Sequence, residues 1–210
     1  MRKLTPKYGY LLILVGLFFA QFLFISPVGE FALNDDWVHT EIARHWADTG
    51  EFRMIPFAGP TFYLPIIYGA ALIKLFGFSF TILRLSTLAF SLATIIVFYF
   101  FLNKISDRPK LAFLGTLALW LNPIFYNLSF TFMTDIPALF FIIVSVYFYY
   151  AGFESQNKLW LLIGGLVATA GFFIRQTNIL VLVAAGIFSL TQSEKIPFKT
   201  TLWIFGIPAI

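Results

Sequence analysis

The chain has 210 residues, of which 60% are hydrophobic, 20% aromatic and 11% charged. Soluble domains carry about 25% charged residues, so this composition excludes a soluble globular enzyme. The net charge of +4 comes without a basic run that could follow a nucleic-acid backbone, and the absence of cysteine excludes disulfides and thiolate chemistry. The composition therefore predicts an all-α polytopic membrane protein.

Hydropathy divides the chain into long apolar runs, and a membrane-spanning helix needs ~20 mostly apolar residues. The first run, from Tyr8 to about Pro27, follows a basic head and lacks a small-residue cleavage site, so we expect a retained span rather than a signal peptide. A last run from Thr200 to Ile210 is too short to span, and from it we expect a truncated chain that forms a single domain over 1–210. The other predicted spans lie at about 82–103, 111–127, 136–152, 159–174 and 178–191.

The run 61–77 is the ambiguous segment, because it is apolar but short and contains a proline, a glycine and a lysine. Lys and Arg concentrate in cytoplasmic loops. If the N-terminus is cytoplasmic and 61–77 does not cross, nine Lys and Arg lie inside and five outside; if it crosses, six lie inside and eight outside. The charges thus predict a surface or re-entrant helix on the outer side. They also place Asp35 and Asp36 on the same face as Asp135.

The only long polar stretch, residues 28–60, holds six of the ten acidic residues, both histidines and two arginines. Its pattern predicts an amphipathic helix that begins near Trp37, lies at the membrane surface and ends at Gly50. The apolar stripe of this helix has helical spacing and contains Val38, Ile42 and Trp46. The residues able to cap its start are Asn34, Asp35 and Asp36.

Two acidic positions are candidates for catalysis. For Asp35 and Asp36, the structural interpretation is helix capping, and the functional one is a carboxylate that acts as a general base at the water–lipid boundary. One of the pair can cap while the other reacts. Asp135 lies in FTFMTDIPALFF between apolar runs, where a lone ionisable residue marks a candidate functional site. Its structural interpretation is again a helix start, with Thr134 as the other residue able to cap.

Two arginines lie among apolar residues, Arg84 in FTILRLST and Arg175 in FFIRQTNIL. The structural interpretation is a side chain that snorkels to the interface, and the functional one is a guanidinium that binds a phosphate. Arg175 belongs to a dense polar group for a membrane segment, which favours a cavity-lining position. The other members of this group are Gln176, Thr177 and Asn178.

Metal binding has weak support in the sequence. His39 and His45 are six residues apart and do not share a helix face, so we expect surface helix residues. Charge alone allows a divalent cation, Mg²⁺ or Mn²⁺, between Asp35, Asp36 and Asp135, but no ligand spacing argues for one.

Several motifs occur in a recognisable order. They are NDDW in the polar loop, TGEF after its helix, FGFSF followed by LRLST, MTDIP before a later span, and RQTN after the next one. This ordered set extends over nearly the whole chain and resembles the polyprenyl-phosphate-sugar-dependent membrane glycosyltransferases of the GT-C fold. The most similar branch contains the protein O-mannosyltransferases and aminoarabinose transferases, and RQTN is also similar to the dolichyl-phosphate-glucose glucosyltransferases. A lysine that precedes the surface helix in the aminoarabinose transferases has no counterpart in AGPTFY.

The resemblance implies a GT-C-type transmembrane helix bundle with an outer juxtamembrane helical loop between the first two spans, the catalytic loop being about 28–80. It implies inverting transfer of a sugar from a polyprenyl-phosphate donor to a hydroxyl of a glycan, lipid or protein acceptor. The site would face outward from a membrane, which we expect to be a bacterial plasma membrane. Asp36 or Asp35 would be the general base, and Asp135 would support the acceptor or the loop, or help to hold a metal ion if one is bound. Substrate-binding roles would fall to Arg84, Arg175, Gln176, Tyr63 and His39.

Two other classes of function remain open at this level. A transporter or lipid flippase would carry polar residues at mid-depth along several spans, whereas here such residues are few. A non-catalytic scaffold fragment is the other alternative, and it would also explain why the last apolar run is too short to span a membrane. No nucleic-acid partner is expected.

Overall fold

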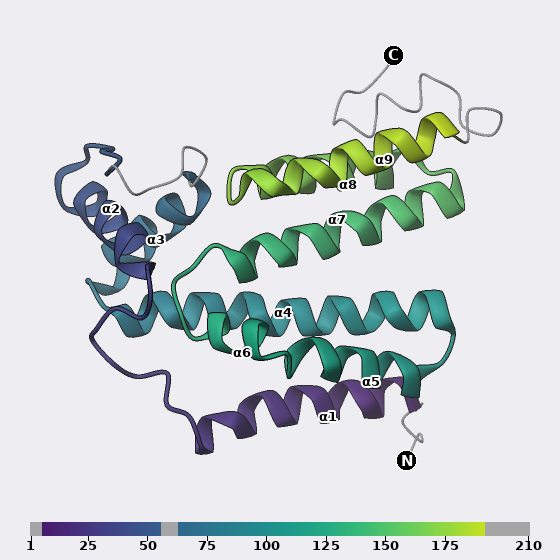
Figure 1. Ribbon diagram of the computed structural model, residues 1–210, viewed down its shortest axis with the longest axis horizontal. Helices are drawn as coiled ribbons and strands as arrows, with labels where there is room; N and C mark the ends of the chain where they lie inside the picture. Colours follow the sequence, from purple (N-terminus) through teal and green to yellow (C-terminus); the bar gives the residue numbers. More distant parts are fainter. Residues whose placement is uncertain (1–5, 56–62, 192–210) are drawn as a thin grey trace. The chain divides into compact units, whose positions relative to one another are not determined.

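The computed structural model describes residues 6–55 and 63–191, and the regular elements of these segments are helices (Figure 1). The chain divides into two compact units, so the prediction of a single domain stays a prediction. Unit 1 contains α1 (Pro6–Ala20), η1 (Gln21–Leu23), α2 (Asp36–Thr49), most of α3 (Tyr63–Phe76), α4 (Phe80–Ser106), α5 (Pro109–Trp120) and α6 (Pro123–Ser129), and it continues to Ile136. Unit 2 contains Tyr63 and Leu64, α7 (Asp135–Ser155) from Pro137, α8 (Lys158–Phe172), η2 (Gln176–Asn178) and α9 (Ile179–Thr191).

The core of unit 1 is formed by α1, α4 and α5, which pack against one another along their lengths (Figure 1). Leu14 of α1 and Ile95 of α4 are fully buried in it. A small residue allows α4 and α5 to approach closely, because a Cβ at Gly115 would lie 2.7 Å from a methyl group of Leu102. Such close packing is what holds helices together where lipid removes the hydrophobic driving force.

The predicted span at 111–127 is two helices rather than one, because α5 and α6 meet at a bend of 67°. Pro123 has no backbone N–H, and it occupies the first turn of α6. The side chain of Asn122 caps the new helix by accepting hydrogen bonds from the N–H groups of Ile124 and Phe125. One apolar run of the sequence therefore contains the end of one helix and the capped start of the next.

The polar loop folds as the sequence predicts around its helix. α2 begins one residue before Trp37 and ends at Gly50, whose φ of 76° is the left-handed conformation that glycine adopts without strain. α3 follows as a separate apolar helix of 14 residues. At 1.5 Å per residue it is about 21 Å long, shorter than the ~30 Å hydrocarbon core of a bilayer. Whether the segment crosses the membrane stays a prediction from the charge distribution.

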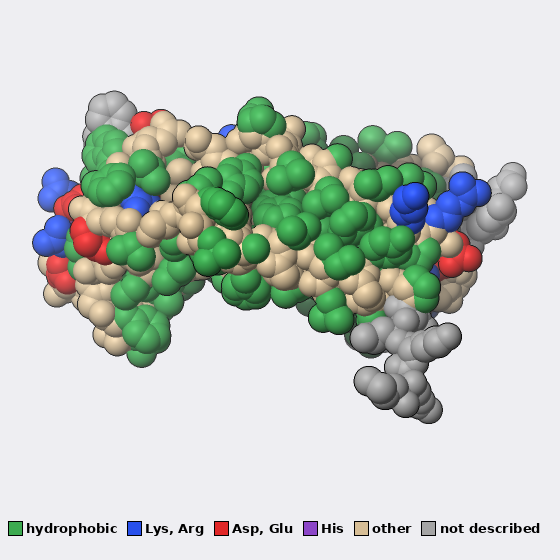
Figure 2. All heavy atoms as spheres, turned by 90° about the horizontal axis from the view of Figure 1, so that it is seen from below, with side chains coloured by type: hydrophobic (Ala, Val, Ile, Leu, Met, Phe, Trp, Pro, Cys, Tyr) green, Lys and Arg blue, Asp and Glu red, His purple; other side chains and the backbone are tan. Residues whose placement is uncertain are grey.

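Three helical segments of the described chain are long and apolar enough to cross a membrane, or four if the bent pair α5–α6 is one span. The three are Pro6–Leu23, Phe80–Ser106 and Asp135–Ser155, which match predicted spans. α8 and α9 are apolar but have only 15 and 13 residues. Figure 2 shows hydrophobic side chains across the middle of one face and charged side chains gathered towards its two ends, as a membrane protein requires. The short run Thr200–Ile210 lies outside the described residues.

Unit 2 is held by close contacts between helices at small residues. A Cβ at Gly164 of α8 would lie 2.8 Å from the ring of Tyr149 in α7, so the absence of a side chain permits this contact. Beside it, the hydroxyl of Ser145 donates a hydrogen bond of 2.7 Å to the carbonyl oxygen of Gly164. The buried cluster around these contacts contains Tyr149, Leu161, Ala168, Leu182 and Ala185.

Candidate functional site

The first acidic candidate, Asp36, is fully buried at the start of α2. Its two carboxylate oxygens accept hydrogen bonds from different parts of the chain: Oδ1 from the N–H of Leu33 at 2.8 Å and Oδ2 from the N–H of Phe132 at 3.2 Å. Burial raises the pKa of Asp36 above its ordinary value, while the two N–H groups and the positive charge of Arg84 oppose that rise. Asp36 is thus a buried link between two loops.

Its neighbour Asp35 has the opposite environment. Asp35 occupies the N-cap position of α2, but its side chain accepts no capping hydrogen bond, and the residue is exposed. Asn34, just before it, has a φ of 60°, a left-handed conformation that asparagine tolerates better than most residues. This turn leaves the carboxylate of Asp35 at the surface while that of Asp36 lies inside.

Phe132, which donates one of these hydrogen bonds to Asp36, is the residue at which three segments of unit 1 meet. Its backbone N–H donates to Asp36, and its buried ring lies edge-on to Tyr68 of α3 with centroids 5.7 Å apart. A Cβ at Gly69 would lie 2.8 Å from the same ring and 3.2 Å from Ala43 of α2, so α2, α3 and the segment before α7 meet here. Asp135, half-buried, follows three residues later as the first residue of α7. The structure therefore brings the two acidic segments to one region.

Arg84 differs from both of its expected roles. Its side chain is only 2% exposed, so it does not snorkel to a surface. The guanidinium donates hydrogen bonds to the carbonyl oxygens of Gly29, at 2.9 Å, and of Phe31, and it lies 4.9 Å from the centre of the Phe31 ring. Both terminal nitrogens of the guanidinium donate to the loop that leads to Asp35, and the side chain is buried, so we do not assign Arg84 to a phosphate.

Glu30, for which we predicted no role, lies in the same loop. Its carboxylate accepts hydrogen bonds from the hydroxyls of Ser79 and Thr81, each at 2.7 Å, and from the N–H of Phe80 at 2.9 Å. These bonds lower the pKa of Glu30, the Ser79 and Thr81 hydroxyls being the largest causes. Glu30 therefore caps the start of α4 while Arg84 holds the neighbouring carbonyls. The signal in the sequence that could have indicated this cap is the pair of hydroxyl residues, Ser79 and Thr81, at the start of an apolar run.

The prediction that His39 is a surface residue is wrong, because the structure leaves it only 4% exposed. His39 lies three residues after Asp36 and three before Ile42, a spacing that places all three on one face of a helix. Asp36 and Ile42 are both buried, so the inner face of α2 is wider than the predicted apolar stripe. A substrate-binding role for His39 would require access that this position does not give.

Three predicted substrate-binding residues belong to unit 2. Arg175 is half-buried and Gln176 exposed in the turn between α8 and α9. The amide of Asn178 anchors this turn by donating a 3.0 Å hydrogen bond to the carbonyl oxygen of Ala138 in α7. Tyr63 is 41% exposed and lies edge-on to Phe173, with ring centroids 6.5 Å apart.

The residues present do not fit a metal site. Within 6–55 and 63–191, no three His, Asp or Glu side chains gather closely enough to hold an ion. Asp36 in addition uses both of its oxygens to accept backbone N–H groups. We therefore derive no step through a divalent cation held by Asp35, Asp36 and Asp135.

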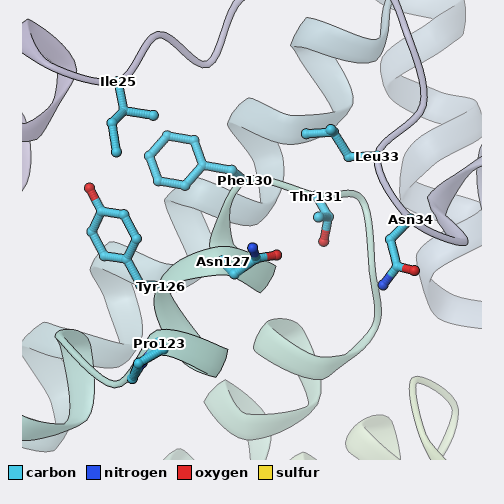
Figure 3. A pocket seen from close by; sticks show the side chains of 8 residues that line it. All are labelled: Ile25, Leu33, Asn34, Pro123, Tyr126, Asn127, Phe130 and Thr131. Atoms are coloured by element: carbon cyan, nitrogen blue, oxygen red, sulfur yellow. The ribbon is translucent and has the colours of Figure 1, made fainter.

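A pocket of about 590 Å³ lies beside the acidic loop in unit 1 (Figure 3). Asn34, which precedes Asp35, lines it, and so does Thr131, which precedes Phe132. Asp36 bonds to Leu33, which lines the pocket, and to Phe132, which follows the lining residue Thr131, so it ties these two parts of the lining to each other. The lining residues are Ile25, Leu33, Asn34, Pro123, Tyr126, Asn127, Phe130 and Thr131.

These helices and this loop define an all-helical integral membrane protein with an acidic site beside a pocket. Residues 66–209, more than half of the chain, match the family described as dolichyl-phosphate-mannose-protein mannosyltransferase, and the chain belongs to that family. Neither the search of curated proteins nor that of solved structures gives a match. Membership makes the protein a membrane glycosyltransferase of the GT-C type that uses a polyprenyl-phosphate sugar donor. The matched range contains Arg84, Asp135 and Arg175, whereas Asp35 and Asp36 precede it.

Proposed function

We propose that the protein transfers a sugar from a polyprenyl phosphate to an acceptor hydroxyl at the outer face of the membrane, with Asp35 as the general base. The observation that carries this proposal is the contrast within the acidic pair. Asp35 is exposed next to a pocket, whereas both oxygens of Asp36 are occupied by backbone N–H groups. A base must reach the proton that it removes, which favours Asp35 over Asp36.

In the proposed reaction, the acceptor oxygen attacks the anomeric carbon from the side opposite the phosphate. The new carbon–oxygen bond forms as the bond to the phosphate oxygen breaks, so the configuration inverts. Asp35 takes the hydroxyl proton, and polyprenyl phosphate leaves with the bonding electron pair. The lipid tail of the donor stays in the bilayer throughout.

The other named residues receive supporting roles. Asp36 is a positioning residue, because its carboxylate ties the loop that carries Asp35 to the segment before Asp135. Asp135 remains a candidate for contact with the acceptor. Arg175 is the candidate for the donor phosphate on chemical grounds, since an arginine offers paired donors to phosphate oxygens and Arg84 is engaged with loop carbonyls.

The proposal is tested by measuring transfer of a labelled sugar from polyprenyl phosphate by the protein reconstituted in lipid vesicles. We expect transfer by the wild type and its loss in Asp35→Asn. The matched control is Asp48→Asn, since Asp48 is exposed on the same helix and forms a surface ion pair of 3.7 Å with Arg44. Transfer that survives in Asp35→Asn, or a wild type with no transfer, would overturn the proposal.

The outer position of the site has its own test, since the chain lacks cysteine. Single cysteines at Asp48, in the loop, and at Ser106, at the far end of α4, can be labelled in whole cells with an impermeant thiol reagent. We expect labelling at position 48 and none at position 106. The reverse pattern would place the acidic loop in the cytoplasm.

A further inference from the structure

The pocket beside Asp35 has an uneven lining. In Figure 3, Ile25, Tyr126 and Phe130 gather on one side, while Leu33, Asn34 and Thr131 lie on the other with Asn127 between the two groups. The first side is apolar and aromatic apart from the Tyr126 hydroxyl, and the side next to the acidic loop offers amide and hydroxyl groups beside the Leu33 side chain. This division suits a ligand that has an apolar portion and a polar portion.

The lining carries no formal charge, and this restricts the polar portion of the ligand. None of the residues that line the pocket is Lys, Arg, Asp, Glu or His. A phosphate would leave its charge uncompensated in such a pocket, because Arg84 of α4, which holds the loop, is itself buried against carbonyl groups. Amides and a hydroxyl instead match the hydroxyl groups of a neutral headgroup, which both donate and accept hydrogen bonds.

The surroundings of the apolar side indicate where the ligand comes from. Ile25 follows Leu23 and Phe24, which are 83% and 86% exposed, and Tyr126 lies on the same short helix as Ile124, 70% exposed. Exposed large apolar side chains at the end of a span face lipid in a membrane protein. The apolar side of the pocket is therefore flanked by surfaces that contact the bilayer.

We infer that this pocket binds the acceptor, and that the acceptor is a neutral, hydroxyl-bearing lipid that enters from the bilayer; the inference rests on the proposed function. The headgroup hydroxyls lie against Asn34, Asn127 and Thr131, beside Asp35. The apolar portion lies against Tyr126 and Phe130. The donor phosphate binds elsewhere.

The test uses the full protein in phosphatidylcholine vesicles and a dodecyl glucoside that carries a diazirine on its alkyl chain. After irradiation, we expect saturable cross-linking to α6 and to the loop around Leu33, reduced by unlabelled dodecyl glucoside. Asn127→Trp fills the pocket and abolishes this cross-linking, and Asn127→Leu, which removes only the amide, weakens it. The matched control is Ile124→Trp on the same helix, which does not line the pocket and leaves cross-linking intact.

Three outcomes would overturn the inference. Competition by polyprenyl phosphate would make the pocket a donor site. Competition by a neutral serine- or threonine-containing peptide would make the acceptor a protein. Cross-linking that is not saturable, or that persists in Asn127→Trp with an unchanged thermal midpoint, would exclude binding in the pocket. Cross-linking needs no sugar transfer, so these outcomes are separate from the loss or survival of transfer in Asp35→Asn.

Discussion

The carboxylate of Asp36 accepts a hydrogen bond from the backbone N–H of Phe132, 96 residues further along the chain, at 3.2 Å. A second bond, from the N–H of Leu33, occupies the other oxygen. One buried side chain thereby connects the loop that presents Asp35 to the segment that ends at Asp135. This connection assigns a structural role to one member of the acidic pair and leaves the other accessible.

Asp36→Asn should destabilise the protein, because it removes an acceptor from a buried backbone N–H group. An asparagine offers one oxygen instead of two, so one of the two N–H groups loses its acceptor inside the protein. Leaving a buried donor without a partner costs about 1–3 kcal/mol, whereas Asp48→Asn at the surface should stay within about 0.5 kcal/mol. Unfolding of both variants in detergent micelles measures the difference. Equal stability of the two would show that the buried bonds of Asp36 contribute nothing.

Arg84→Lys should release the loop that precedes the acidic pair. A lysine keeps the charge but cannot hold several carbonyl groups in the fixed geometry of a guanidinium. We expect faster hydrogen exchange at the amides of residues 28–31, while the amides of α5 keep their exchange rates. If exchange is unchanged and the KM for the donor rises instead, Arg84 contacts the donor and not the loop.

Glu30→Gln should change the stability of the protein in a pH-dependent way. Because folding lowers the pKa of Glu30 below its ordinary value of 4.5, its ionised form stabilises the folded state. That contribution is complete above pH 4.5 and is lost as the pH falls through the lowered pKa. The thermal midpoints of wild type and variant should therefore differ at pH 7 and converge in acid. A difference that persists unchanged at low pH would contradict the role of the carboxylate.

The meeting point of α2, α3 and Phe132 should not accept a larger residue. A methyl group at Gly69 would lie 2.8 Å from the buried Phe132 ring, and overpacking of this kind costs about 1–3 kcal/mol. Gly9 in α1 has no atom within 4 Å of such a methyl group, so Gly9→Ala should gain up to about 1 kcal/mol from helix propensity. Opposite shifts in thermal midpoint are expected for the two alanine variants, and a stabilised Gly69→Ala would show that this contact is loose.

The helical architecture was predictable because its signals are local. Apolar length locates α1, α4 and α7, and the glycine that follows α2 marks its end. The bond between Asp36 and Phe132 joins the acidic loop to the segment before Asp135, whereas the face of the membrane on which they lie stays a prediction from the charge distribution. Apolar length and the helix-ending glycine can be recognised in a short stretch of sequence, and the charge argument needs only the number of Lys and Arg in each loop.

The remaining features depend on contacts between distant segments. The sequence shows two adjacent aspartates, but only the fold buries one and exposes the other. The sequence around Arg84 suggests a phosphate ligand. Only the structure shows that its partners are carbonyl groups of a loop about fifty residues earlier in the chain. The buried position of His39 likewise reflects packing around a broader face of α2. The side chains that line the pocket come from three separate segments, which no pattern in the sequence connects.

The most direct test of the central claim is turnover per folded molecule for Asp35→Asn and Asp36→Asn. We predict that Asp35→Asn keeps the thermal midpoint of the wild type and loses about 10²–10⁴-fold in kcat, the usual contribution of a general base. Asp36→Asn should lose stability while its folded fraction retains transfer to a much greater extent. The opposite pattern, with transfer abolished by Asp36→Asn in a stable protein and retained by Asp35→Asn, would contradict the division of roles within the acidic pair.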